Sequence, residues 1–132
     1  MTSSLAGAPR PTLSLLLLAI GFTIGGMLHL IRPAPYIRIM PPWLPAPAAL
    51  VLISGVAEIA GGLGIVLPLT RVAAGWGLIA LLVAVFPANV QMLLGAVAHQ
   101  ASRGWIVLLI ARLPLQIALI WWVWRAAVRQ PA

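Results

Sequence analysis

The only acidic side chain in the sequence, that of Glu58, lies inside a long apolar stretch, residues 48–67. An α-helix of about 20 residues crosses the hydrocarbon core of a bilayer, which is about 30 Å thick. Glu58 would therefore lie near the bilayer midplane. A charged group at that depth is costly unless it is paired inside the protein, and an ionisable residue there is a candidate functional site.

Arg112 is the expected partner of Glu58, because it lies inside a second apolar stretch, residues 105–124. At a rise of 1.5 Å per residue, Glu58 lies about 15 Å, Arg112 about 12 Å and Asn89 about 13 Å from the same expected membrane face. We therefore expect an ion pair between Glu58 and Arg112. Gln116 lies one helical turn beyond Arg112. Its side chain and that of Asn89 would satisfy the remaining hydrogen-bond donors and acceptors of this ion pair.

His29 lies at the end of the first apolar stretch, near the same membrane face. It completes a candidate polar cluster that consists of His29, Glu58, Asn89, Arg112 and Gln116. Trp43 and Phe86 are expected to line a pocket beside this cluster. Small residues that share a helix face with Glu58, among them Gly55 and Gly62, would let another helix approach closely.

Three interpretations of the polar cluster stay open. Polar side chains inside membrane proteins often only hold helices together, at about 0.6 kcal/mol per hydrogen bond. Alternatively, Arg112, Asn89 and His29 would donate hydrogen bonds to the carbonyl oxygens of a quinone or another small apolar ligand. The third interpretation is a proton or ion path through Glu58, although transporters usually have more spans and an internal repeat.

The cluster does not favour catalysis or metal binding. General acid–base catalysis usually needs a second titratable group, and the guanidinium of Arg112 does not deprotonate in proteins. His29 would serve only if the chain brought it near Glu58. The two histidines and the one carboxylate lie in three different segments, so we expect no metal site. We expect no catalytic residue, and a quinone is the cofactor that the cluster would suit.

The composition indicates an integral membrane protein. Of the 132 residues, 63% are hydrophobic and 7% are charged, whereas a soluble domain has about 25% charged residues. The net charge of +7 comes from arginines that lie singly, mostly at the ends of apolar stretches, which is typical of topology-setting residues rather than of a nucleic-acid-binding surface. The sequence has no cysteine, so it forms no disulfide.

The sequence predicts an all-α four-helix bundle in the membrane, as a single domain over residues 1–132. The expected spans cover residues 13–31, 48–67, 73–98 and 105–124. Residues 32–47 join the first two spans and contain six prolines, which argue against a regular helix. Because this segment is also rich in apolar side chains, it is expected to lie at the membrane interface, as a cap over the bundle or as an ordinary linker. Pro87 predicts a kink or local unwinding in the third span.

An even number of spans places both termini on one side of the membrane. The arginines expected at that side are Arg10, Arg71, Arg125 and Arg129, and those at the other are Arg32, Arg38 and Arg103. Four against three predicts cytoplasmic termini by the positive-inside rule.

An ordered set of short motifs resembles the DoxX-like family of small four-helix membrane proteins. The motifs are GGMLH at 25–29, PPWLPAP at 41–47, SGVAEIAGG at 54–62, the turn at 68–71, FPANVQM at 86–92 and RLPLQ at 112–116. The resemblance implies a four-helix bundle in the bacterial inner membrane with a site formed by His29, Glu58, Asn89 and Arg112. Some members of that family are linked to quinone-coupled sulfur oxidation, and others to oxidative-stress complexes or to the assembly of partner proteins.

Two functions are therefore expected. The first is a non-enzymatic accessory subunit of a larger membrane redox or respiratory complex, in which the chain contacts lipid, other membrane subunits or further copies of itself. The alternative is a membrane protein that binds a quinone or another small apolar ligand at Glu58, Asn89 and Arg112. Nucleic acid is not an expected partner.

Overall fold

The computed structural model describes residues 10–129, and within these residues the fold is all-α, as predicted. Among these described residues, four helices are long and apolar enough to cross a membrane, which confirms the expected number of spans. A short helix follows the first long helix, and a π-helical turn extends the last one. In chain order the elements are α1 (Leu13–Ile31), α2 (Ala34–Arg38), α3 (Pro47–Gly64), α4 (Arg71–Ala98), α5 (Arg103–Val123) and η1 (Trp124–Val128).

Local signals set the helix ends. The hydroxyl of Thr12 accepts a hydrogen bond from the backbone N–H of Leu15 and caps α1, and Ser102 caps α5 in the same way. α3 begins at Pro47, whose missing N–H costs nothing in the first turn. All four long helices start within two residues of the predicted spans.

The end of α3 differs more from the prediction, because the helix ends at Gly64 and not at residue 67. Arg71, predicted to be a topology-setting residue at the membrane surface, is instead buried. Its guanidinium donates hydrogen bonds to the carbonyl oxygens of Ile65 (2.9 Å) and Val66 (3.2 Å). Backbone carbonyls just past a helix end lack helical partners, so this arginine satisfies them.

The proline-rich segment contains a helix that the sequence argument excluded. α2 is only five residues long, and its two prolines are Pro33 at the N-cap and Pro35 in the first turn. A first turn has no internal acceptor for its N–H groups, so proline is tolerated there. α4 likewise continues as an α-helix through Pro87, so the prediction of local unwinding in the third span is wrong.

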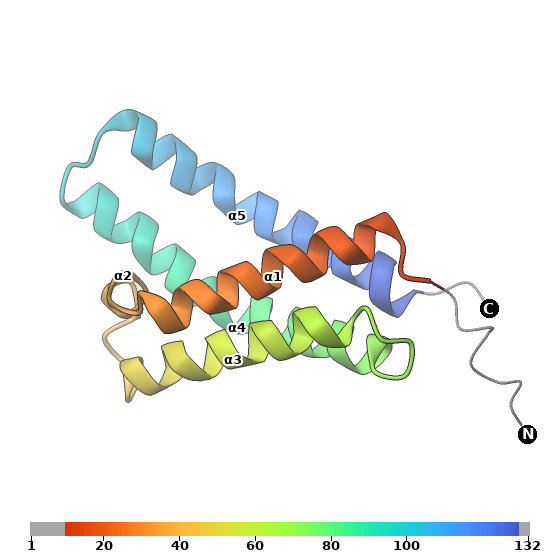
Figure 1. Cartoon of the computed structure of the whole chain (residues 1–132). Coiled ribbons are helices and arrows are strands. Elements are labelled where there is room, and N and C mark those ends of the chain that lie inside the picture. The colour runs from red at the N-terminus through yellow and green to blue at the C-terminus, as the bar shows by residue number, and fades with distance from the viewer. Residues whose placement is uncertain (1–9, 130–132) are drawn as a thin grey trace, which may run out of the picture.

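The helices pack tightly at one end of the molecule and separate at the other (Figure 1). α1 and α3 lie side by side along their length, whereas α4 packs against α3 and then against α5. The buried core lies at the end where α1 begins and α5 ends. Its members are Leu15, Leu18, Ala19, Phe22, Ile65, Leu78, Leu82, Val123 and Ala127. Toward the other end, the α4–α5 pair diverges from α1 and α3 (Figure 1).

Glycines bring α1 and α3 into close contact, as the sequence predicted for the face around Glu58. A Cβ atom built on Gly55 of α3 would lie 2.7 Å from the Cβ of His29 and 3.0 Å from the carbonyl oxygen of Gly26, both on α1. A Cβ on Gly62 would lie 3.1 Å from the carbonyl oxygen of Ala19. The two backbones can meet only because these positions have no side chain.

Candidate functional site

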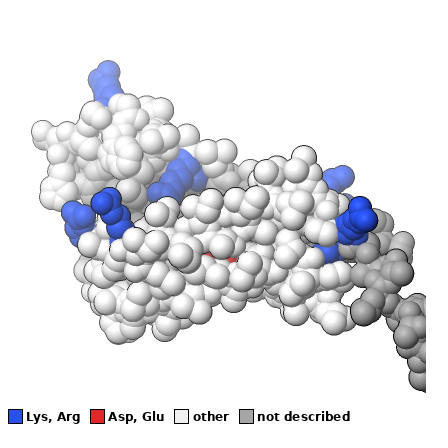
Figure 2. Space-filling model, viewed as in Figure 1, with Lys and Arg blue, Asp and Glu red and all other residues white. Residues whose placement is uncertain are grey.

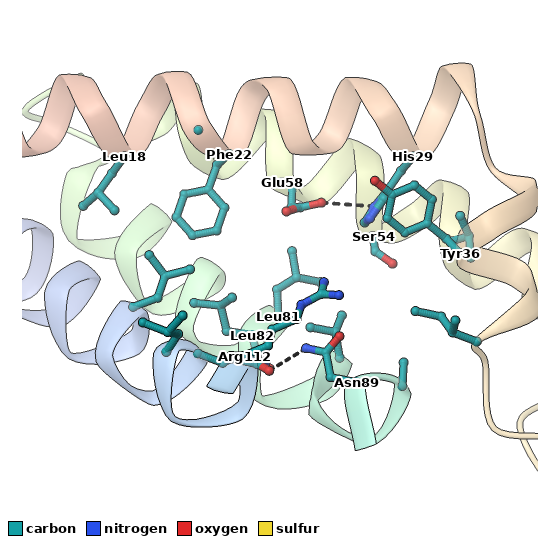
Figure 3. A pocket seen from close by; sticks show the side chains of 18 of the residues that line it. Leu18, Phe22, His29, Tyr36, Ser54, Glu58, Leu81, Leu82, Asn89 and Arg112 are labelled. Carbon is teal, nitrogen blue, oxygen red and sulfur yellow. Dashed lines mark hydrogen bonds and ion pairs between the residues drawn. The ribbon is translucent and has the colours of Figure 1, made fainter. Parts of the chain in front are cut away.

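A cavity of about 460 Å³ lies in the space between α1, α2 and α3 on one side and α4 and α5 on the other (Figure 3). Its volume is in the usual range for a small-molecule site. Most of its lining is apolar and comes from α1, α4 and α5. The polar and aromatic polar residues that line it are His29, Tyr36, Ser54, Glu58, Asn89, Arg112 and Gln116. All five residues of the predicted polar cluster therefore share one cavity.

One wall of the cavity carries Glu58 and His29. Their Oε2 and Nδ1 atoms are 3.1 Å apart, and their side chains are about five-sixths buried (17% and 15% exposed). The two atoms are close enough for an ion pair, but they are not aligned as a hydrogen bond. The close approach of α1 and α3 at Gly26 and Gly55 places these side chains face to face.

The predicted ion pair between Glu58 and Arg112 is therefore wrong. Glu58 pairs with His29, and across residues 10–129 Arg112 forms no ion pair. Among the described residues, the hydrogen-bond partner of its guanidinium is the sulfur of Met92, at 3.6 Å. The reason is the helix arrangement: α5 packs on α4 and stands across the cavity from α3 (Figure 1). Figure 3 shows Arg112 reaching into the cavity between Glu58 and Asn89.

The opposite wall carries two amides that bond to each other. The side-chain N–H of Asn89 donates to the side-chain oxygen of Gln116, and the amide N–H of Gln116 donates to the backbone carbonyl of Leu82. Both amides were expected to hydrogen-bond to the pair of Glu58 and Arg112. In the structure they hold α4 and α5 together instead.

The proline-rich segment covers the pair of Glu58 and His29. The ring of Tyr36, on α2, meets the ring of His29 edge to face, with centroids 4.0 Å apart and planes at 73°. Tyr36 and two following residues, Ile39 and Met40, line the cavity. The segment is thus a cap over the bundle, and the alternative of a plain linker is excluded.

Two predicted lining residues lie outside the cavity. Trp43 is 71% exposed, and Phe86 does not line the cavity. Phe86 follows the lining residue Val85, and one residue of an α-helix turns a side chain by about 100°. The aromatic rings that do line the cavity belong to Phe22, Tyr36 and Trp122. Hydropathy does not encode the relative rotation of the helices, so it does not predict which aromatic rings face the cavity.

Chemically, the cavity combines an apolar volume with one carboxyl group, one imidazole and one guanidinium. His29 lies beside Glu58, so a second titratable group is near the carboxyl group, as general acid–base catalysis would need. Within the described part of the chain, no three side chains of metal-ligand type gather in one place. The arrangement thus suits the binding of an apolar molecule with a polar head.

Four long apolar helices around a mostly apolar cavity with a few polar side chains fit a multi-pass membrane protein, in contact with a lipid bilayer. The chain belongs to the family described as "Domain of unknown function (DUF8561)", whose sequence model matches residues 18–127. The matched range runs from α1 into η1 and contains every member of the predicted polar cluster. Comparisons with curated proteins and with solved structures gave no match.

Proposed function

We propose that this chain is a membrane protein that binds a small apolar ligand with a polar head, such as a quinone, in the cavity between its helices. The observation that carries the proposal is the cavity itself: about 460 Å³, mostly apolar, with Arg112 reaching into it (Figure 3). If the polar side chains here only held the helices together, the space between them would be filled by other side chains, since protein interiors are close-packed.

The arrangement of the lining supports this proposal. The apolar rings of Phe22 and Trp122 offer flat surfaces to a ligand ring or chain. The guanidinium of Arg112 has several N–H donors without an acceptor among the described residues, and these suit the oxygens of a ligand head group. The cap formed by α2 lies over the cavity at the imidazole of His29, which the ring of Tyr36 contacts.

The experiment compares two glycine variants. Gly21 lines the cavity, and a Cβ built on it meets nothing within 4 Å. The phenyl ring of Gly21→Phe should therefore occupy the ligand's space and lower the affinity for a short-chain ubiquinone at least tenfold. Gly77→Phe is the matched control, because Gly77 is also in an open position on a helix but does not line the cavity.

Equilibrium binding to the purified protein in an uncharged detergent is the measurement. Equal binding by wild type and Gly21→Phe would contradict the proposed site. Because both substitutions replace a helical glycine in open space, their effects on helix formation are alike, and the difference between them reports the cavity.

A second candidate function is that of a DoxX-like accessory subunit of a larger membrane redox or respiratory complex. The observation that favours it is the α4–α5 end, which stands apart from α1 and α3 (Figure 1). Apolar side chains are exposed there, including Leu94, Val97, Trp105 and Leu108. Gentle extraction from the native membrane followed by native mass spectrometry tests this candidate: a stable larger complex supports it, and a lone chain or homo-oligomer contradicts it.

We also propose the bacterial inner membrane as the location, with both termini in the cytoplasm. Figure 2 shows most of the basic side chains toward the two ends of the molecule. Between them the surface is mostly uncharged, interrupted by one basic side chain and a few atoms of the acidic one. At the end where α5 stops, the guanidinium groups of Arg125 and Arg129 lie over the rings of Trp121 and Trp124, at 5.4 and 5.6 Å. Arginine and tryptophan together are typical of the membrane interface, and the count of four arginines against three, which includes the buried Arg71, supports cytoplasmic termini.

A further inference from the structure

The cavity contains a positive charge that the chain itself does not neutralise, and this charge defines the class of ligand. We infer that the ligand is an amphipathic anion, a single acyl chain with an acid head group, whose acid group binds Arg112. This inference rests on the proposed function, namely that the cavity binds a small apolar ligand.

The only acidic side chain in the sequence lies beside His29 and not beside Arg112. Glu58 lies 3.1 Å from His29, and the pair shares one wall of the cavity. Arg112 lies across from that pair, and its contact with the described residues is the thioether of Met92, a weak and uncharged acceptor. The guanidinium of Arg112 is therefore without a counter-ion from residues 10–129.

The depth of Arg112 makes this costly without a ligand. Arg112 is nine residues into α5, about 14 Å along the helix from its start at Arg103. A cation at such a depth in a membrane is disfavoured unless an anion or a water-filled cavity stabilises it. A guanidinium binds a carboxylate or phosphate through two parallel hydrogen bonds, and these charge-assisted bonds are stronger than those to a neutral carbonyl.

On one face of α5, a row of apolar side chains that line the cavity follows Arg112. Arg112, Leu115, Leu119 and Trp122 line the cavity, at steps of three and four residues, which places them on the same side of the helix. From Arg112 to Trp122 the helix rises about 15 Å, which is half the hydrocarbon thickness of a bilayer. One acyl chain of a lipid spans that half, so a single chain of ordinary length fits between the arginine and the tryptophan.

The experiment compares an acid with its neutral analogue. Radiolabelled laurate is bound to the full chain in an uncharged detergent and is displaced by unlabelled laurate, dodecanol or lauroyl lysophosphatidate. We expect laurate to compete at least tenfold better than dodecanol with the wild-type protein. Lysophosphatidate distinguishes the source of the acid group: stronger competition than laurate indicates a phospholipid-type ligand, and weaker competition indicates a free fatty acid.

Three arginine variants locate the preference for the acid. Arg112→Gln should bring the ratio of the laurate and dodecanol affinities to about one, and Arg112→Lys should retain a preference for laurate. Arg103→Gln is the control, because Arg103 is exposed on the same helix and does not line the cavity. The ratio within one variant is independent of the fraction of folded protein, so partial unfolding does not obscure the result.

The outcomes separate this inference from the proposed function. If laurate and dodecanol bind wild type equally and Gly21→Phe weakens both, the cavity is a ligand site and the anion inference is wrong. The inference is also overturned if Arg112→Gln keeps the preference for laurate. If Gly21→Phe changes the binding of neither probe nor of the short-chain ubiquinone, the proposed function itself fails.

Discussion

The contact between α1 and α3 at Gly55 can be tested with a single methyl group. In Gly55→Ala, the new Cβ would lie 2.7 Å from the Cβ of His29 and 3.0 Å from the carbonyl oxygen of Gly26. Neither atom is the far end of a flexible side chain, so the two helices must move apart. Such overpacking costs about 1–3 kcal/mol.

The same substitution also has a favourable effect, because alanine is a better helix former than glycine by about 1 kcal/mol. The expected net result for Gly55→Ala is thus a loss of between about zero and 2 kcal/mol in the free energy of unfolding. Gly77→Ala is the matched control, since a Cβ on Gly77 meets nothing within 4 Å, and it should stabilise the protein by about 1 kcal/mol.

The measurement is equilibrium unfolding in mixed micelles of increasing denaturing detergent, followed by circular dichroism. The quantity compared is the difference between the two alanine variants, expected to be about 1–3 kcal/mol. Equal stability of Gly55→Ala and Gly77→Ala would refute the close contact. Because His29 and Glu58 face each other at this contact, Gly55→Ala should also weaken ligand binding, whereas Gly77→Ala should leave it unchanged.

Three further outcomes are expected from the same unfolding assay. Arg71→Ala should lower the free energy of unfolding by about 1–3 kcal/mol, since two buried carbonyls lose their donor, while Arg38→Ala at an exposed site should change it by about 0.5 kcal/mol or less; similar values for both would contradict the capping role of Arg71. Glu58→Leu alone should cost about 1–3 kcal/mol, since the imidazole of His29 loses its polar neighbour, and the double variant with His29→Leu should be nearly neutral; additive losses would show that the two are not paired. Gln116→Leu removes both hydrogen bonds of this amide, leaves the side-chain N–H of Asn89 without its acceptor and should cost about 1–3 kcal/mol; wild-type stability would show that these amide bonds do not hold α4 to α5.

Local properties of the sequence determined the class of the fold. The four spans follow from the length of each apolar stretch, and the helix starts follow from short-range caps such as Thr12 and Ser102. The depth of Glu58, Asn89 and Arg112 along their helices depends only on residue counts, and these residues do line one cavity. Hydropathy and helical rise act within one segment, so they can be evaluated before the helices are assembled.

The partner of Glu58 was decided by the tertiary structure. By residue count Arg112 was at a depth close to that of Glu58 and His29 was nearer the membrane face, yet the arrangement of the helices makes His29 the partner. α1 and α3 touch through Gly26 and Gly55, which brings His29 to the carboxylate, while α5 stands across the cavity with α4. The tertiary structure also decided the rotation of α4, which turns Phe86 away from the cavity, and the burial of Arg71 against the end of α3. Depth is a one-dimensional property of each helix, but contact depends on distance and rotation between helices, and these arise only when all the helices pack together.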